Sequence, residues 1–246
     1  MRHERSAPSG HTYLEFNAPL SAERADTLIA GLRPLAGARV LDLGCGWAEL
    51  LLRLLAAEPT ATGIGLDTDT EAIERGAANA QERGLSQRIE LLNADATAWS
   101  GDAADVVIAI GSSHAWEGTT GLLEAAASHL RPAGRLLLGE EIWECPPTPA
   151  ALTALGVHKD EYRELGPLVD LAIERGYRPL SIATATLDEW DAFESGWCAG
   201  RERWLLDHPD AEDADEVRAV VDEHRNRWLH GYRKILGFAY LTFART

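Results

Sequence analysis

The stretch Val40-Leu41-Asp42-Leu43-Gly44-Cys45-Gly46-Trp47 decides the fold of this chain. A short apolar run ends in an acid and is followed by two glycines that bracket one residue. This pattern predicts a buried parallel strand, a tight loop and a helix that begins near Ala48. Glycine has no Cβ, so the loop can turn sharply and pass close to a ligand. By itself, the unit indicates a nucleotide-type site, and the strands that follow decide which type.

Strand and helix patterns alternate around this stretch. Strands are expected at residues 39–43, 62–67, 89–93, 105–110 and 134–139, and helices at about 21–32, 48–57, 71–83 and 119–130. Further helices are expected at about 160–175 and, as a pair broken near 207–210, within 187–235, with strands at about 179–186 and 238–244. Ser21 is expected to cap the first helix. Closely spaced prolines predict an irregular segment at 144–149.

Alternation of this kind predicts an α/β fold: a Rossmann-like, mostly parallel sheet of seven strands with helices on both faces. A helical insertion precedes the last strand. The expected division is an N-terminal lid and helix segment at 1–34, a core at 35–186, a helical cap at 187–236 and the last core strand at 237–246.

The composition excludes several classes of partner. The chain has 23 Lys and Arg against 39 Asp and Glu, a net charge of −16, which disfavours nucleic acid and anionic membranes.

Cys45, Cys145 and Cys198 have no paired spacing, which argues against a disulfide framework and a cysteine zinc site, and we expect no metal. There is no signal-type segment and no apolar run that could span a bilayer, so a cytoplasmic protein is expected, of undetermined oligomeric state.

Three acids end the first three expected strands at 39–43, 62–67 and 89–93, or follow them closely. They are Asp42, Asp67 and Asp95. Asp67 lies about 20 residues beyond the glycine loop, where an acid accepts hydrogen bonds from ribose hydroxyls. Ligands of open α/β sheets bind outside the carboxyl ends of the strands, so all three acids should face one crevice. Because no lysine or arginine stands among them, they favour a ligand with a ribose and a cationic part over a pyrophosphate.

In order and spacing, Asp42-Leu43-Gly44-Cys45-Gly46, Asp67 and Asp95-Ala96 resemble the class I S-adenosylmethionine-dependent methyltransferase family, over about residues 35–140. The resemblance implies S-adenosyl-L-methionine as cofactor. It implies that the Gly44–Gly46 loop lies against the methionine part, that Asp67 holds the ribose hydroxyls, and that Asp95 accepts from the adenine amino group beside the Ala96 amide. The implied cofactor-binding set is Asp42, Gly44, Cys45, Gly46, Asp67, Thr68, Asp95, Ala96 and Gly111.

Other interpretations of the same residues stay open. A nicotinamide-dependent oxidoreductase on a similar fold fits less well, because a G-x-G-x-x-G pattern from Gly44 needs glycine where Glu49 stands. A protein of this fold could also bind the cofactor or a partner and transfer nothing. The two glycines could serve only a tight turn. Cys45 is interpreted as a small buried filler and not as a nucleophile.

Candidate catalytic residues follow the fourth and fifth expected strands. In the family, the segment 111–117 faces the methyl group, and here it lacks the Asn or Asp with two prolines and an aromatic residue that is frequent in nucleobase amino methyltransferases. His114 could take a proton from an acceptor hydroxyl or amine, or it could only hold the loop. Glu140 could act as a base or orient a cationic amine, or it could be a solvated strand end.

Aromatic residues mark the expected acceptor side. The stretch from Glu140 to Trp143, with prolines after it, resembles a subgroup of bacterial small-molecule methyltransferases, so we expect transfer to an N, O or C atom of a metabolite or natural product. A basic peptide acceptor is left open. The candidate substrate-binding residues are Tyr13, Phe16, Trp116, Trp143 and Trp197. The tryptophans of 187–236 could form an aromatic cap, could simply pack as a core, or could do both.

Overall fold

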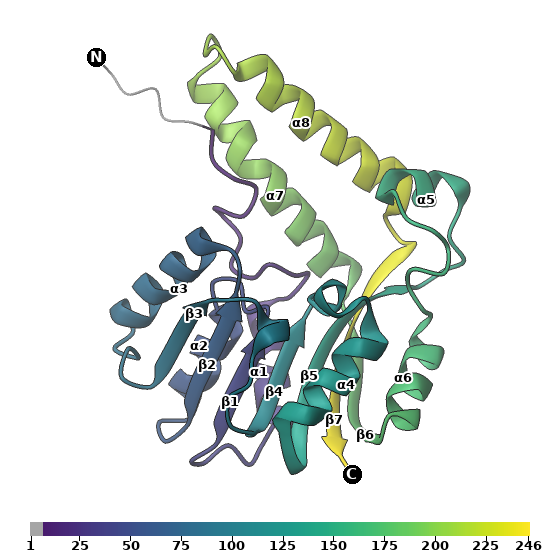
Figure 1. Cartoon of the computed structure of the whole chain (residues 1–246). Helices are drawn as coiled ribbons and strands as arrows, with labels where there is room; N and C mark the ends of the chain where they lie inside the picture. Colours follow the sequence, from purple (N-terminus) through teal and green to yellow (C-terminus); the bar gives the residue numbers. More distant parts are fainter. Residues whose placement is uncertain (1–6) are drawn as a thin grey trace. The chain divides into compact units, whose positions relative to one another are not determined.

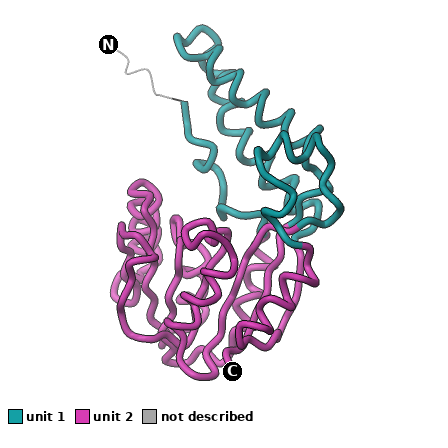
Figure 2. Tube along the Cα trace, turned by 45° about the vertical axis from the view of Figure 1, so that its right-hand side comes forward, with its two compact units in different colours: residues 1–20, 143–163, 185–237 teal, residues 21–142, 164–184, 238–246 magenta. Residues whose placement is uncertain are grey.

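The computed structural model describes residues 7–246, so the first six residues of the expected lid segment lie outside the described part. The chain forms two compact units, shown in two colours in Figure 2. The sheet unit consists of residues 21–142, 164–184 and 238–246. The helical unit consists of the described residues of 1–20, together with 143–163 and 185–237. The helical unit therefore takes in more of the chain than the 187–236 insertion expected from the sequence.

The seven-stranded sheet has the order β3-β2-β1-β4-β5-β7-β6 (Figure 1). The strands are β1 (Arg39–Leu43), β2 (Thr62–Asp67), β3 (Ile89–Asn93), β4 (Ala104–Ile110), β5 (Leu130–Trp143), β6 (Tyr177–Thr184) and β7 (Leu236–Arg245). Strands β1 to β5 pair in parallel, and β6 pairs antiparallel with β7. The expected α/β fold with seven mostly parallel strands is confirmed.

Helices cover both faces of the sheet. The sheet unit contains α1 (Ala22–Gly31), α2 (Glu49–Ala57), α3 (Thr70–Glu82), α4 (Thr119–His129), α6 (Leu165–Glu174) and the short 3-10 turns η1 (Ala96–Ala98) and η2 (Ser113–Trp116). Leu41, Leu43 and Leu138 point from alternate strand positions into one core layer, which α4 and α6 complete. In Figure 1, α1 and α2 lie behind the sheet. The Ser21 hydroxyl caps α1 by accepting from the Arg24 amide, as expected.

The helical unit is built on a pair of long helices, α7 (Leu187–Asp207) and α8 (Ala214–Asn226). They are broken between Asp207 and Ala214, as the sequence predicted. A capping box of Thr186 and Glu189 starts α7, because each side chain accepts from the other residue's backbone amide. The unit also holds α5 (Pro149–Leu155) and the π-helical turn η3 (Arg227–Tyr232) that continues α8.

Three expectations about local structure were wrong. The proline-rich segment was expected to be irregular up to Pro149, yet Pro149 begins α5, where the Thr148 hydroxyl accepts from the Ala151 amide. Proline is tolerated in the first turn of a helix because its missing N–H would be unpaired there anyway. The helix expected at 160–175 begins only at Leu165, and β5 extends well beyond 134–139.

Three properties of the described chain bear on function. Cys45, Cys145 and Cys198 are all free thiols. Among residues 7–246, no set of His, Cys, Asp or Glu side chains is grouped closely enough to hold a metal ion. Over the same residues, no helix has both the length and the apolar character needed to cross a membrane.

Candidate active site

The glycine loop after β1 is closed on one side and open on the other. Gly44 and Gly46 have φ angles of +77° and +54°, which side chains other than glycine rarely adopt. A Cβ on Gly44 would lie 2.6 Å from the Cβ of Ser112, so the loop after β4 packs directly on it. A Cβ on Gly46 would meet no atom within 4 Å. The loop therefore presents bare backbone to open space, where a ligand can approach it.

Asp67, at the end of β2, holds the glycine loop in place. Its Oδ2 accepts from the Gly46 amide at 2.7 Å, and its Oδ1 accepts from the Asp69 amide at 2.9 Å. Each carboxylate oxygen has two lone pairs, so the group can still accept hydrogen bonds from ligand hydroxyls. The neighbouring Thr68 is exposed. The structure thus brings Asp67 and the loop together as the sequence predicted.

Asp42 is a buried carboxyl that no cation balances. It is 4% exposed, and no hydrogen bond or ion pair joins its carboxyl to any residue in 7–246. Burial raises its pKa from 3.8 to about 8, with a further contribution from the negative charge of Asp67. A buried carboxyl without a partner is costly, and a cationic ligand would remove that cost. The buried Asp42 carboxyl therefore fits a cofactor that carries a sulfonium and an ammonium group.

Asp95 and Ala96 follow β3. The Asp95 Oδ1 accepts from the amide and the hydroxyl of Thr97, at 2.8 Å and 2.7 Å, and the hydroxyl in particular lowers the pKa of Asp95. The side chain of Asp95 is exposed, whereas Ala96 is buried. The Ala94 amide donates to the Asp67 carbonyl at 2.9 Å, so this segment is tied to the end of β2. An ionised acceptor therefore stands beside the segment that carries Asp67.

Cys45 and Gly111 complete the predicted cofactor set. Burial raises the pKa of the Cys45 thiol, and the charges of Asp42 and Asp67 raise it further, so the thiol is protonated at neutral pH and is a poor nucleophile. Gly111 has a φ of +65°, and its amide donates to the Gly139 carbonyl at 2.9 Å. It turns the chain from the end of β4 into η2.

The candidate catalytic residues lie in η2 and at the end of β5. Ser113 donates to the Glu140 Oε1 at 2.7 Å, and Glu140 is 5% exposed, so this carboxylate anchors η2. His114 is exposed. Burial raises the pKa of Glu141, and a backbone hydrogen bond and the electrostatic interaction with His114 oppose that rise. The sequence offered both glutamates at this strand end, and Glu140 was preferred to Glu141; because neighbouring strand residues point to opposite faces, the two side chains leave β5 on opposite sides.

Trp116 and Trp143 were both expected to bind substrate. Trp116 is half-buried and packs against the core of the sheet unit. Trp143 is buried in the helical unit, where its Nε1 donates to the Lys159 carbonyl at 2.8 Å and its ring meets the edge of Tyr162 at 5.1 Å between centroids. Trp143 therefore already has structural partners of its own.

Trp197 is partly buried within the helical unit. It stacks on His224 with 3.7 Å between ring centroids, and the guanidinium of Arg201 lies 4.2 Å from its ring. Phe16 is buried, whereas Tyr13 is 56% exposed. Of the predicted acceptor residues in this unit, Tyr13 is the one that presents a large free surface.

A small aromatic cavity of about 210 Å³ lies in the helical unit. Its walls include Trp190, Trp228 and Tyr232, with Glu144 and Lys234 among the charged lining residues. Glu144 lies over Gly237, where a Cβ would be 2.3 Å from its Cγ. The sequence signal for this cavity was the tryptophan-rich insertion, but the position of Glu144 depends on a contact distant in sequence.

Comparisons with known proteins identify methyltransferases among the proteins that this chain resembles. Residues 40–134 match a family model described as a methyltransferase domain. The uncharacterized protein YjhP of Escherichia coli is 30% identical over 223 residues, which cover 89% of this chain and 90% of YjhP. A 27-O-demethylrifamycin SV methyltransferase of Amycolatopsis mediterranei is 32% identical over 67% of this chain and 55% of its own length.

A solved methyltransferase structure is similar to this chain over the whole fold. The crystal structure of a SAM-dependent methyltransferase from Geobacter sulfurreducens, in complex with S-adenosyl-L-homocysteine, has a TM-score of 0.89 and 29% identity. The match covers 96% of each chain. The likeness therefore extends through both units of the present structure.

Proposed function

Because the chain belongs to the class I S-adenosylmethionine-dependent methyltransferase family, we propose that it transfers the methyl group of S-adenosyl-L-methionine to an N, O or C atom of a small-molecule acceptor. The observation that carries the proposal is the aromatic cavity of about 210 Å³ in the helical unit. Sites for small molecules are concave and mostly apolar, with a few polar groups that fix orientation. Trp190, Trp228 and Tyr232 with Glu144 meet that description and suit a flat or cationic molecule.

Two further observations favour a small acceptor. One relative is a 27-O-demethylrifamycin SV methyltransferase, whose name gives a natural product as its acceptor. The net charge of −16 disfavours nucleic acid, since the protein and the phosphate backbone would repel each other.

The sheet unit supplies the groups that would hold the cofactor. Bound there, S-adenosyl-L-methionine supplies an electrophilic methyl group on a positively charged sulfur. The loop of Gly44 and Gly46 admits it closely, and Asp42 offers a buried carboxyl whose ionised form a cationic ligand would stabilise. Asp67 and Asp95 offer ionisable acceptors for hydroxyl and amino groups. Thr68, Ala96 and Gly111 line the same strand ends.

The chain's own chemistry is positioning and proton removal. The hydrogen bond from Ser113 to Glu140 holds η2, so that His114 has a fixed backbone from which to act. A ring nitrogen of His114 takes the acceptor's proton when the acceptor has one to lose, and the negative charge of Glu141 stabilises the imidazolium that forms. Alignment of acceptor and methyl donor supplies most of the remaining rate enhancement.

Transfer of labelled methyl groups tests the proposal. The protein is incubated with methyl-labelled S-adenosyl-L-methionine and a panel of amines, phenols, thiols and carboxylic acids, and the label is followed into the small-molecule fraction. We expect label in at least one acceptor class, and we expect Glu144→Gln to reduce that transfer without changing S-adenosyl-L-homocysteine affinity. Label that enters only an added basic peptide or nucleic acid, or no acceptor at all while the cofactor still binds, refutes a small-molecule acceptor.

A further inference from the structure

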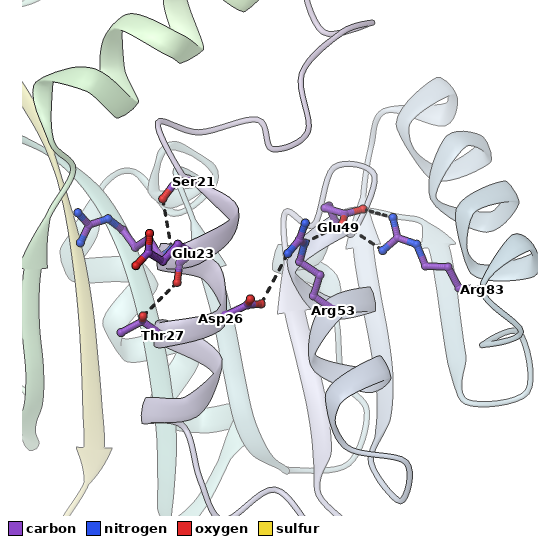
Figure 3. A network of polar contacts seen from close by, with 8 residues as sticks. Ser21, Glu23, Asp26, Thr27, Glu49, Arg53 and Arg83 are labelled. Carbon is purple, nitrogen blue, oxygen red and sulfur yellow. Dashed lines mark hydrogen bonds and ion pairs between the residues drawn. The ribbon is translucent and has the colours of Figure 1, made fainter.

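Glu49 is a buried carboxylate at the first position of α2, directly after the cofactor loop. It is 7% exposed, and buried carboxylates are rare unless they are paired. Arg83 grips both of its oxygens, with Nη1 to Oε1 at 3.0 Å and Nη2 to Oε2 at 2.7 Å. The Nε of Arg53 donates to Oε1 at 3.0 Å (Figure 3). Glu49 therefore makes a bidentate ion pair with one arginine and a single contact with another.

These pairs connect the three helices around the loop. Arg53 belongs to α2 and also lies 3.6 Å from the Asp26 carboxylate on α1. Arg83 directly follows α3 as its C-cap residue. Charges of alternating sign therefore run from α1 through α2 to α3, as Figure 3 shows. Because Glu49 is the central member, its removal breaks the chain of ion pairs at two contacts.

Helix α3 touches the cofactor loop at two further points. The guanidinium of Arg75 lies 4.0 Å from the ring of Trp47. The backbone of α3 comes so close at Gly76 that a Cβ there would be 3.0 Å from the Trp47 carbonyl oxygen. The same helix starts beside Asp67, which accepts from the Asp69 amide. The position of α3 thus determines where both the loop and Asp67 stand.

The end of the loop has no side-chain cap. Ala48, which precedes α2, has a left-handed backbone with φ of 56° and makes no side-chain capping bond. The Gly44 and Cys45 amides donate to the Leu66 carbonyl, and beyond them Asp67 and the packing of α3 hold Gly46 and Trp47. A loop ordered before binding loses less conformational entropy on binding, and so binds its ligand more tightly.

We propose that Glu49 is a positioning residue for the cofactor: its ion pairs with Arg83 and Arg53 hold α3 against the loop, so that the Gly46 amide and the Asp67 carboxylate stand ready for S-adenosyl-L-methionine. Glu49 itself needs no contact with the cofactor. The two-pronged geometry with Arg83 matters, because lysine carries the same charge without the planar fork.

Binding of S-adenosyl-L-homocysteine to the full chain, measured by calorimetry, tests this role. Glu49→Gln keeps the shape and removes the charge, and we expect its Kd to rise by about tenfold. Arg83→Lys keeps the charge and should raise Kd by a smaller factor, while Arg83→Gln should match Glu49→Gln. The control is Glu124→Gln, which removes the ion pair of Glu124 with Arg175 elsewhere in the sheet unit. It should leave Kd within about twofold of wild type.

Hydrogen exchange separates positioning from simple stabilisation. In the ligand-free protein, well below its melting temperature, the Gly46 amide should exchange faster in Glu49→Gln than in the control. A purely structural role would lower the melting temperature and leave both Kd and this exchange rate unchanged in the folded protein. That result overturns the proposal. If Glu49→Gln does not fold, Arg83→Lys decides: a wild-type Kd and Gly46 exchange rate there overturn it equally.

Discussion

Replacing Asp42 with asparagine should stabilise the ligand-free protein at neutral pH and weaken cofactor binding. Burial, together with the charge of Asp67, raises the pKa of Asp42 from 3.8 to about 8 in the folded chain. One pKa unit corresponds to about 1.4 kcal/mol. At pH 7 Asp42 therefore lowers the free energy of unfolding by about 4 kcal/mol, compared with a side chain of the same shape that does not ionise. Asparagine has nearly the same shape as the protonated side chain and cannot ionise.

The sign of the pH dependence follows from the raised pKa. Between about pH 4 and about pH 8, the folded protein keeps a proton on Asp42 that the unfolded chain has lost. The free energy of unfolding contributed by Asp42 therefore falls as the pH rises through this window, by up to about 1.4 kcal/mol per pH unit. Below about pH 4 both states are protonated, so wild type and Asp42→Asn should converge there.

Urea unfolding of both proteins at several pH values measures this difference. The free energy of unfolding of Asp42→Asn should exceed that of wild type by a margin that grows steadily from about pH 5 to about pH 8. The m-values should not change. In calorimetry near pH 7, with two buffers of different ionisation enthalpy, S-adenosyl-L-homocysteine should release protons from wild type and not from the variant. Parallel pH curves, or equal proton release in the two proteins, would refute an Asp42 carboxyl held in reserve for a cationic ligand.

Three further predictions concern other residues of the sheet unit. Asp67→Ala should weaken S-adenosyl-L-homocysteine binding by about tenfold or more in calorimetry, because it removes the acceptor of the Gly46 amide as well as the expected ribose contact; unchanged affinity would contradict the cofactor site. His114→Gln should lower kcat by about 10²-fold with little change in cofactor affinity, whereas full turnover would rule out His114 as the base. Gly44→Ala should cost about 3 kcal/mol in urea unfolding, from its left-handed backbone and its collision with Ser112; a loss near zero would mean that the loop can shift.

The sheet was predictable because its strands are short apolar runs with sharp ends. The predicted bounds of β1, β2 and β3 agree with the structure residue for residue. Helix α5 was missed because Pro149 was interpreted only as a helix breaker. At the first position of a helix, however, proline is favoured, because its fixed φ suits the helix and its missing N–H would be unpaired there. Strand β5 was predicted too short because its outer residues lack a continuous apolar pattern.

The positions of the candidate cofactor residues in the fold were predictable, and the groups that support them were not. Asp42 lies one residue before the end of β1 and Asp67 ends β2, so their positions follow from the sheet alone. The pairing of Glu49 with Arg83 joins residues 34 apart, and no local pattern specifies which arginine meets the carboxylate. In the sequence, Glu49 indicated only that the third glycine of a G-x-G-x-x-G pattern is absent. Similarly, the choice between Glu140 and Glu141 depends on which face of β5 turns toward η2.

The close approach of Gly44 to Ser112 limits how this enzyme can be redesigned. The two residues belong to the loop that follows β1 and the loop that follows β4, and the Ser112 side chain leaves no room for a side chain on Gly44. A library that aims to change acceptor preference can vary an exposed position of η2 such as Ala115 without disturbing this contact. It should keep position 112 no larger than serine. A bulkier residue there would push on the methyl-donor loop, and a screen would record lost cofactor binding as lost selectivity.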